Sequence, residues 1–187
     1  TGIPYNTLYG YYKKTSKQIP EKKCKEYGEK YSVNYYNSID SLLDSEEFDA
    51  AFVCTPTSTH SKIASQLIQE KKSVFVEKPL TYISEEGRDL LQLAEKNKVV
   101  LTCGYIERFN PAVRELRKRL EGKQLGEIYK VDVQRIGPFP PRVTDVGVIT
   151  DLSVHDLDII NYLIGGKPTR IYAETQKKLH PNCEDSV

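Results

Sequence analysis

The sequence contains no methionine, not even at its first position, which is Thr1. It also contains no apolar run near the roughly 18–20 residues that a membrane-spanning helix needs. The missing initiator and the abrupt opening on a β-rich stretch lead us to expect that these 187 residues are part of a longer protein. No signal peptide is visible, and we expect no membrane partner.

The four cysteines are far apart and form no CxxC pair. This spacing is typical of neither a disulfide framework nor a zinc site, so we expect reduced thiols, no metal and a cytoplasmic protein. The net charge is only +1. A near-neutral balance gives no electrostatic basis for binding nucleic acid or a membrane surface. With 39% hydrophobic and 28% charged residues, the chain is ordinary globular material for one large domain or two small ones.

A βαβ unit at residues 50–79 is the central pattern of the chain. Short apolar runs at residues 50–53 and 74–76 are each followed by polar residues and a proline, and residues 61–71 between them carry apolar side chains at helical spacing. Ligands of open parallel sheets bind at the carboxyl ends of the strands. The polar side chains expected there are Thr55, His60, Glu77 and Lys78.

Helices and strands alternate around this unit, which predicts an α/β fold with a doubly wound parallel sheet. The further elements expected are strands at residues 7–12, 35–36 and 99–103 and helices at residues 20–31, 39–43 and 84–97. Ser38 and Ser84 are the expected N-caps of the last two helices, because a serine oxygen accepts a free N–H of the first turn.

The pattern changes after Gly104, and we place a domain boundary near residues 104–108. Asn110 is the expected cap of a basic helix at residues 111–120. Alternating apolar residues at 127–135 predict a long strand of an antiparallel sheet with one wet face. The remaining expected elements are a helix at residues 150–164 and a strand at residues 170–175.

The helix at residues 150–164 carries one polar stripe on an otherwise apolar cylinder. At about 100° per residue, Asp151, His155, Asp158 and Tyr162 fall on this stripe. Asp151 and His155 are four residues apart and can touch. A carboxylate stabilises the imidazolium, which suits a general base. A solvated polar edge without chemistry is the alternative, and the sequence leaves both open.

The loops at the strand ends also allow two readings each. Pro79 keeps Lys78 out of the helical conformation, so the lysine extends over the strand end, either to exchange a proton with a substrate or as a surface residue. The hydroxyls of residues 54–60 either line a cofactor cleft or cap a helix. Arg135 and Arg142 form either an anion site or part of a surface loop.

Four motifs together resemble the glucose–fructose oxidoreductase / inositol dehydrogenase (Gfo/Idh/MocA) family of NAD(P)-dependent oxidoreductases. They are CTPTSTH at 54–60, EKPL at 77–80, GYIERFNP at 104–111 and DLSVHDLD at 151–158. The resemblance implies a Rossmann-like domain at residues 1–105, lacking its first strand and helix. It also implies an α+β domain at residues 106–187 with a mostly antiparallel, truncated sheet.

The resemblance further implies hydride transfer between NAD or NADP and a hydroxyl carbon of a sugar, polyol or nucleotide sugar. Lys78 would lie beside nicotinamide and substrate, often with a cis bond to Pro79. Asp151 and His155 would match the acidic–histidine pair, with His155 as proton acceptor. The other residues expected to bind cofactor are Lys13, Thr55, Pro56, His60, Glu77 and Arg108. Those expected to bind substrate are Asn110, Arg135, Arg142 and Asp158.

The sequence departs from the family at two places. The glycine fingerprint GxGxxG is absent, and because its strand would precede residue 7 we expect that it is missing from this chain, not replaced. Relatives that prefer NAD usually carry an acidic residue after the strand at residues 7–12, where this chain has Lys13 and Lys14. Two cations suit a 2′-phosphate, so NAD and NADP both stay open.

Three hypotheses for the function follow. The first is an active dehydrogenase, and the loop RIGPFPPR at residues 135–142 is similar to the nucleotide-sugar branch of the family, such as UDP-N-acetylglucosamine 3-dehydrogenases. The second is a non-catalytic cofactor- or sugar-binding relative, and the third an unrelated α/β protein whose motifs match by chance. The resemblance also implies a homo-oligomer, because relatives commonly assemble through the open face of the C-terminal sheet and alternating strands would leave such a face here.

Overall fold

The computed structural model describes residues 21–138 and 146–187, with the side chains of residues 21–23 left aside. The contacts divide the chain into two compact units, Thr1–Gly104 and Tyr105–Val187, called here the first and the second unit. The expectations for the strand at residues 7–12, for Lys13 and for Arg142 lie outside the described residues.

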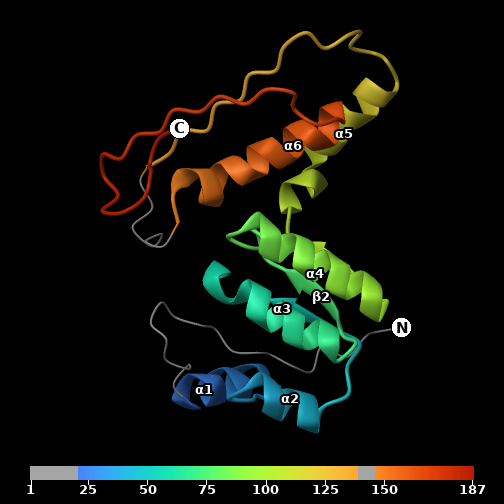
Figure 1. The fold of residues 1–187 in the computed structure, drawn as a ribbon, viewed down its shortest axis with the longest axis vertical. Coiled ribbons are helices and arrows are strands. Elements are labelled where there is room, and N and C mark those ends of the chain that lie inside the picture. The colour runs from blue at the N-terminus through green and yellow to red at the C-terminus, as the bar shows by residue number, and fades with distance from the viewer. Residues whose placement is uncertain (1–20, 139–145) are drawn as a thin grey trace. The chain divides into compact units, whose positions relative to one another are not determined.

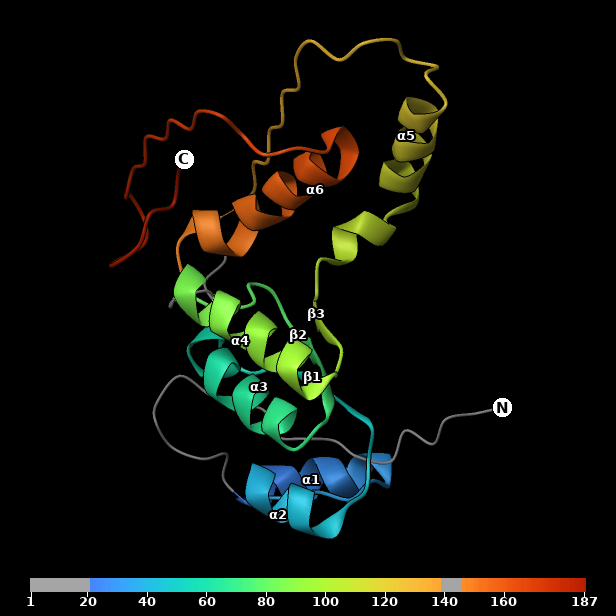
Figure 2. The same ribbon diagram turned by 45° about the vertical axis from the view of Figure 1, so that its right-hand side comes forward.

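A parallel sheet forms the centre of the first unit. Its strands are β1 (Ala50–Val53), β2 (Ser73–Val76) and β3 (Leu101–Cys103), paired in the order β1-β2-β3. The connections are α3 (His60–Gln69) and α4 (Ser84–Asn97), which lie side by side against the strands (Figure 1, Figure 2). The βαβ unit and the Rossmann-type parallel sheet expected from the sequence are thereby confirmed.

The core of the first unit lies between one face of this sheet and the two helices. Alternation along β1 and β2 turns valines inward and phenylalanines outward, and Phe52 stays 66% exposed while Val53 is 2% exposed. α3 buries the apolar positions that its helical spacing predicts. The buried cluster is Val53, Ile63, Ala64, Leu67, Ile68, Val74, Val76, Leu90 and Ala94.

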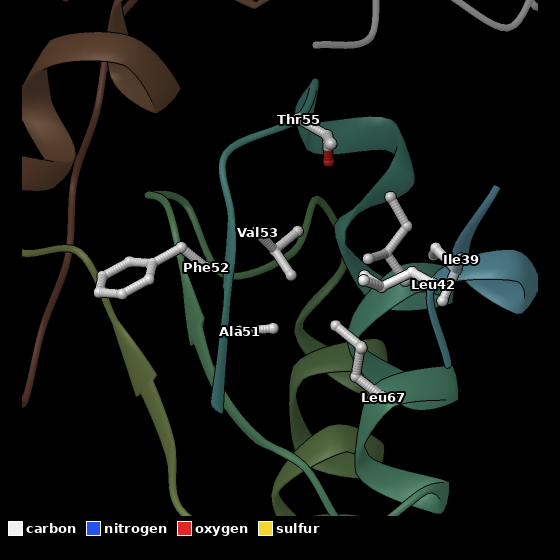
Figure 3. Close-up of a pocket in the computed structure, with 8 residues that line it drawn as sticks. Ile39, Leu42, Ala51, Phe52, Val53, Thr55 and Leu67 are labelled. Atoms are coloured by element: carbon white, nitrogen blue, oxygen red, sulfur yellow. The ribbon is translucent and has the colours of Figure 1, made fainter. Parts of the chain in front are cut away.

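Two further helices, α1 (Glu21–Tyr31) and α2 (Ile39–Ser45), complete the described part of the first unit. Ser38 caps α2 as expected, in a capping box in which the backbone N–H of Ser41 donates to Ser38 Oγ. An apolar recess lies between α2, β1 and α3 (Figure 3). The residues that line it are Ile39, Leu42, Ala51, Phe52, Val53, Thr55, Ile63 and Leu67.

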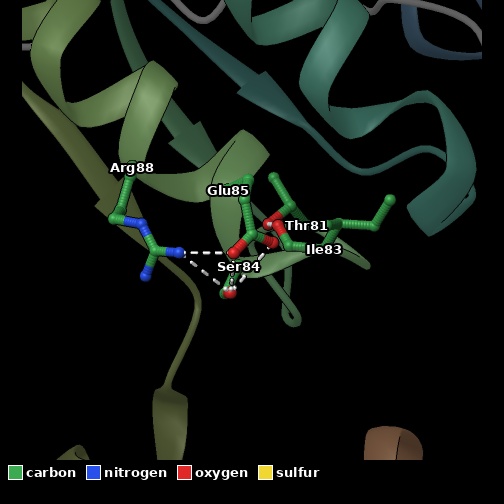
Figure 4. A network of polar contacts seen from close by, with 5 residues as sticks. All are labelled: Thr81, Ile83, Ser84, Glu85 and Arg88. Atoms are coloured by element: carbon green, nitrogen blue, oxygen red, sulfur yellow. Dashed lines mark hydrogen bonds and ion pairs between the residues drawn. The ribbon is translucent and has the colours of Figure 1, made fainter.

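Two local expectations for the first unit are wrong. Tyr35 and Tyr36 form no strand, and the Tyr36 hydroxyl instead donates to the carboxylate of Glu46 over 2.5 Å. Ser84 does not cap α4, because Ile83 occupies the N-cap position. The Ser84 hydroxyl instead donates to the neighbouring Glu85 carboxylate over 3.2 Å (Figure 4). In both cases a side-chain hydrogen bond replaces the backbone pattern that the residue type favours.

The second unit contains α5 (Pro111–Glu121) and α6 (Val154–Ile164), which pack against each other. Asn110 caps α5 as expected, since its Oδ1 accepts the N–H of Ala112 over 3.0 Å. The helix expected at residues 150–164 instead opens with a π-helical turn, Ile149–Ser153, before α6. Gly165, with a φ of +67°, ends α6 in a conformation that favours glycine.

The strands expected at residues 127–135 and 170–175 do not form, and this part of the sequence reading is wrong. In the described residues of the second unit, the one β-type pairing is an isolated antiparallel bridge between Gln176 and Ser186. These residues contain no β-strand. Apolar alternation marks a surface suited to half-burial, but a strand also needs a neighbour for its N–H and C=O groups. Ile128, Val131 and Val133 remain 43%, 44% and 48% exposed.

Candidate functional site

The carboxyl ends of the three parallel strands meet at one edge of the sheet, which we call the sheet edge. Thr55, Glu77 and Gly104 follow β1, β2 and β3 at this edge. The N–H of Glu77 donates to the carbonyl of Val53 over 2.9 Å, and the N–H of Gly104 donates to that of Val76 over 2.8 Å. Backbone pairing therefore continues beyond the strands and fixes the start of each loop.

The Glu77-Lys78-Pro79 turn projects from the middle of the sheet edge. The Lys78–Pro79 peptide bond is cis, as the family resemblance implies. The backbone N–H of Lys78 donates to Glu77 Oε2 over 3.1 Å. A Cβ atom on Gly104 would lie 3.0 Å from that same oxygen, so glycine at this position leaves room for the Glu77 carboxylate.

The loop after β1 is held by its own hydroxyl groups. Thr59 Oγ1 lies 2.7 Å from Thr55 Oγ1 and 2.8 Å from the carbonyl oxygen of Pro56. A 3₁₀ turn, Thr57–Thr59, leads into α3, and no side chain caps that helix. The alternative in which Thr57 or Ser58 caps α3 is therefore wrong. Thr55 and Pro56 are half-buried at the sheet edge.

His60, which the resemblance places along the cofactor cleft, is only 1% exposed. Its Nδ1 lies 2.8 Å from the carbonyl oxygen of Pro79, and its Nε2 lies 2.8 Å from that of Thr55. Each nitrogen is within hydrogen-bond distance of a carbonyl acceptor, and in a neutral ring the tautomer decides which of the two nitrogens carries the N–H that donates. The imidazole therefore lies inside the protein and connects the loops that follow β1 and β2.

Cys54 lies beside this edge but is not prepared for nucleophilic chemistry. Burial raises the pKa of its thiol, and the nearby negative charge of Glu77 raises it further. Because the thiolate is the reactive form, a raised pKa keeps the group protonated and unreactive near neutral pH.

In the second unit, two residues expected to bind ligands contact each other. Arg108 donates from Nε and Nη2 to the carboxylate of Asp158, over 2.7 and 2.5 Å. This hydrogen-bonded carboxylate raises the pKa of the guanidinium. Asp158 is only 9% exposed, and the guanidinium carbon of Arg108 also lies 5.4 Å from the ring centre of Tyr162. Asp158 and Tyr162, two of the four residues on the polar stripe of the helix, thus both contact Arg108.

Arg135 is engaged in a similar way. Its Nε and Nη2 donate to the carboxylate of Asp156 over 2.9 and 2.7 Å, and this contact raises the pKa of Arg135. Sequence reasoning missed Asp156, because it lies off the polar stripe and no periodicity links residues so far apart along the chain. The only hint of Asp156 in the sequence is that it directly follows His155.

Asp151 and His155 lie on consecutive pieces of one helical segment. Asp151 belongs to the π-helical turn and His155 to the first turn of α6, and both are half-buried. A π-helical turn contains more residues than an α-helical turn, so the spacing between the two differs from that assumed in the polar stripe. Turns of this kind occur frequently at functional sites.

Across residues 21–138 and 146–187, no three His, Cys, Asp or Glu side chains gather closely enough to hold a metal ion. None of the helices in the same ranges has the length and apolar character to cross a membrane.

Two family models match most of the chain. Residues 12–105 match the oxidoreductase family with an NAD-binding Rossmann fold, and residues 113–187 match the GFO/IDH/MocA C-terminal domain. The chain belongs to the Gfo/Idh/MocA oxidoreductase family. The sheet edge with its Lys78 turn is therefore the strand-end edge of an NAD-binding Rossmann domain.

Named members of this family include dehydrogenases for nucleotide sugars and for polyols. UDP-N-acetylglucosamine 3-dehydrogenase of Acidithiobacillus ferrooxidans is 37% identical over 74% of this chain and 42% of its own length. Scyllo-inositol 2-dehydrogenase (NAD(+)) of Bacillus subtilis is 32% identical over 81% of this chain and 44% of its own length.

A solved structure of the Acidithiobacillus ferrooxidans enzyme superimposes with a TM-score of 0.76 at 31% identity. The superposition covers 87% of this chain and 52% of that one. The chain spans between 42% and 51% of the length of the curated relatives it matches.

Proposed function

We propose that the protein is an NAD(P)-dependent dehydrogenase that moves a hydride between nicotinamide and a hydroxyl carbon of a sugar, polyol or nucleotide sugar. The Glu77-Lys78-Pro79 turn at the sheet edge carries this proposal, since the chain belongs to a family of nicotinamide-dependent oxidoreductases. The two relatives named above are dehydrogenases of a nucleotide sugar and of a polyol, which supports the substrate class.

The sheet edge fits a nicotinamide cofactor. Thr55, Pro56 and Lys78 are half-exposed there, and Gly104 carries no side chain that would fill the space beside Glu77. When bound, the cofactor supplies the hydride acceptor or donor. Thr55, Pro56 and Glu77 would hold its nicotinamide half. Lys13 lies outside the described residues, so NAD or NADP as the preferred form stays a prediction.

The protein itself has to move the hydroxyl proton. We assign His155 as the base that accepts it and Asp151 as the carboxylate that stabilises the resulting imidazolium. Lys78 donates a hydrogen bond to the substrate hydroxyl, because an ammonium group is a strong donor with freely rotating N–H bonds. Arg108 would lie near the cofactor, and Asn110 and Asp158 near the substrate. The Arg108–Asp158 ion pair and the Asn110 cap of α5 fix the positions of these side chains.

Among possible substrates we favour a nucleotide sugar. Arg135 is paired with Asp156, and its side chain is 39% exposed. Exposed ion pairs contribute only about 0–1 kcal/mol, so a diphosphate that binds the guanidinium through two oxygens can displace the aspartate. Arg142 would add a second cation but lies outside the described residues. Homo-oligomeric assembly and a cytoplasmic location stay predictions.

The test is turnover by the full-length protein of UDP-N-acetylglucosamine, myo-inositol and glucose with NAD and with NADP. We expect the nucleotide sugar to be preferred and His155→Ala to lower kcat by about 100- to 10,000-fold, as for loss of a general base. Leu157→Ala, at a 54% exposed position of the same helix, is the matched control and should leave kcat unchanged.

Three outcomes separate the hypotheses. Preference for the free polyols would overturn the nucleotide-sugar assignment but not the dehydrogenase. Full activity of His155→Ala would overturn the assignment of the base. Cofactor binding without turnover of any sugar would favour the non-catalytic relative.

A further inference from the structure

The His60 imidazole joins two loops that the sheet alone does not join. Nδ1 contacts the carbonyl of Pro79, which lies 19 residues away in the sequence, and Nε2 contacts the carbonyl of Thr55. These carbonyls belong to the loops after β2 and β1. The ring is 1% exposed at the first residue of α3, a helix whose apolar face lies in the core of the first unit.

We propose that His60 is a positioning residue, which fixes the Lys78-Pro79 turn against the loop after β1 and so sets the direction in which the Lys78 side chain leaves the sheet edge. This role differs from direct cofactor binding, because both ring nitrogens lie 2.8 Å from backbone carbonyl oxygens of the protein. The proposal rests on the proposed function in so far as Lys78 acts on the substrate.

The N–H of Glu77 ties the start of this turn to the carbonyl of Val53 in β1 over 2.9 Å, and two further contacts are local. The N–H of Lys78 donates to its neighbour Glu77, and the Thr81 hydroxyl donates to the carbonyl of Ile83 over 2.8 Å (Figure 4). Contacts between neighbours shape a turn but do not fix it relative to the rest of the domain. The His60 contact ties the far end of the turn, at Pro79, to α3, whose apolar face lies in the core.

The chemistry of the ring explains why histidine suits the position. A carbonyl only accepts, so a ring nitrogen donates to the carbonyl that it faces only when it carries the N–H, and in a neutral ring one of the two nitrogens does. Loss of the ring leaves two partly buried carbonyls without this donor, which is costly in a low-dielectric site. The turn can then relax, and misplacement by about 1 Å can lower turnover about 100-fold.

Two substitutions of His60 each keep a donor for one of the two carbonyls and remove the donor for the other. His60→Asn places an amide N–H₂ where Nδ1 was and keeps the donor to Pro79. His60→Gln places it where Nε2 was and keeps the donor to Thr55. If the Pro79 contact positions Lys78, we expect His60→Asn to retain most of the wild-type kcat. His60→Gln and His60→Ala should then lose about 10- to 100-fold in kcat, with a smaller change in KM for the cofactor.

Leu67→Ala is the matched control, because Leu67 lies two turns along α3 and is 3% exposed, and its side chain has no group that could donate to either carbonyl. It should lower stability without the loss in kcat. Amide hydrogen exchange of the full-length protein gives a readout that does not depend on turnover. We expect His60→Ala to speed exchange in residues 77–83 and 54–59, and Leu67→Ala to speed it across α3 and the strands.

The outcomes separate this proposal from the proposed function. If the wild-type protein turns over no sugar, the dehydrogenase assignment fails and hydrogen exchange alone decides the role of His60. Equal losses of kcat in His60→Asn and His60→Gln would overturn the proposal. Unchanged exchange in residues 77–83 of His60→Ala would also overturn it.

Discussion

The two units hold their candidate site residues by different physical means. In the first unit, Lys78 leaves a sheet edge that is fixed by backbone hydrogen bonds and by the buried ring of His60. In the second unit, the charged residues around His155 are fixed by paired side chains, Arg108 with Asp158 and Arg135 with Asp156. A turn held by hydrogen bonds to a buried ring should respond to loss of that ring, and a helix held by ion pairs should respond to lost charge.

Burial follows the same division. The most deeply buried hydrophobic side chains among the described residues belong to the first unit, and Ile68 and Val76 have no exposed surface. In the described part of the second unit, α5 has no buried residue and α6 buries only Asp158. We therefore expect the largest effects on stability from core substitutions in the first unit.

The largest expected effect is that of Ile68→Ala in α3. It should lower the free energy of unfolding by about 2–5 kcal/mol, because it removes a large buried side chain and leaves a cavity. The matched substitution in the second unit is Leu157→Ala, which should change it by about 0.5 kcal/mol or less at a 54% exposed position. Chemical denaturation measures both, and equal losses would contradict the difference between the units.

The next effect tests the charges of the second unit. Asp158→Ala should lower the free energy of unfolding by about 1–3 kcal/mol, since it leaves the Arg108 guanidinium without its acceptor. The 43% exposure of the Arg108 side chain keeps the loss below that of a fully buried pair. Asp156→Ala, which removes a carboxylate that is 16% instead of 9% exposed, should cost about 1 kcal/mol or less. A larger loss for Asp156→Ala would show that burial of the carboxylate does not decide how much each ion pair stabilises the fold.

A smaller effect is expected at the sheet edge. A Cβ atom at Gly104 would lie 3.0 Å from Glu77 Oε2 and 3.2 Å from the ring of Phe75. Gly104→Ala should therefore destabilise by about 1 kcal/mol, because the carboxylate and the ring have to move. Gly137→Ala, where nothing lies within 4 Å, serves as the control. Equal stability of the two variants would mean that the Glu77 carboxylate and the Phe75 ring can move aside without a measurable cost.

The smallest expected effect is a pH dependence of stability at Asp185 in the second unit, whose carboxylate accepts backbone hydrogen bonds. The N–H groups of His180, Leu179 and Lys178 donate to the Asp185 carboxylate and lower its pKa below the ordinary 3.8. A lowered pKa stabilises the fold above the unfolded value, and this stabilisation is lost as the pH falls through the folded value. An acid titration followed by amide NMR should shift residues 178–180, and Asp185→Asn should abolish the shift.

Local patterns of the sequence were sufficient to predict much of the first unit. The apolar runs of β1 and β2, the helical spacing of α3 and the cap at Ser38 each depend on neighbouring residues, and the structure confirms them. The position of Lys78 at a strand end follows from the same parallel topology. Exact helix starts were harder, as at Ser84, because several polar residues compete for one cap.

The parts that sequence reasoning missed depend on contacts between distant residues. The partners Arg108 and Asp158 are 50 positions apart, and Arg135 and Asp156 are 21 apart, so no periodicity reveals them. The alternating residues at 127–135 favour a strand, but whether one forms depends on a neighbouring strand. The inward orientation of His60 was likewise invisible, because the sequence shows a residue type and not the carbonyls that surround it.

The most direct test of hydride transfer is an isotope experiment on the full-length protein. A UDP-N-acetylglucosamine labelled with deuterium at the carbon that is oxidised would be turned over with unlabelled oxidised cofactor, and the reduced cofactor analysed by mass spectrometry. We expect the deuterium to appear in the nicotinamide ring. Oxidised sugar accompanied by unlabelled cofactor, with the deuterium lost to water, would contradict direct transfer at this site.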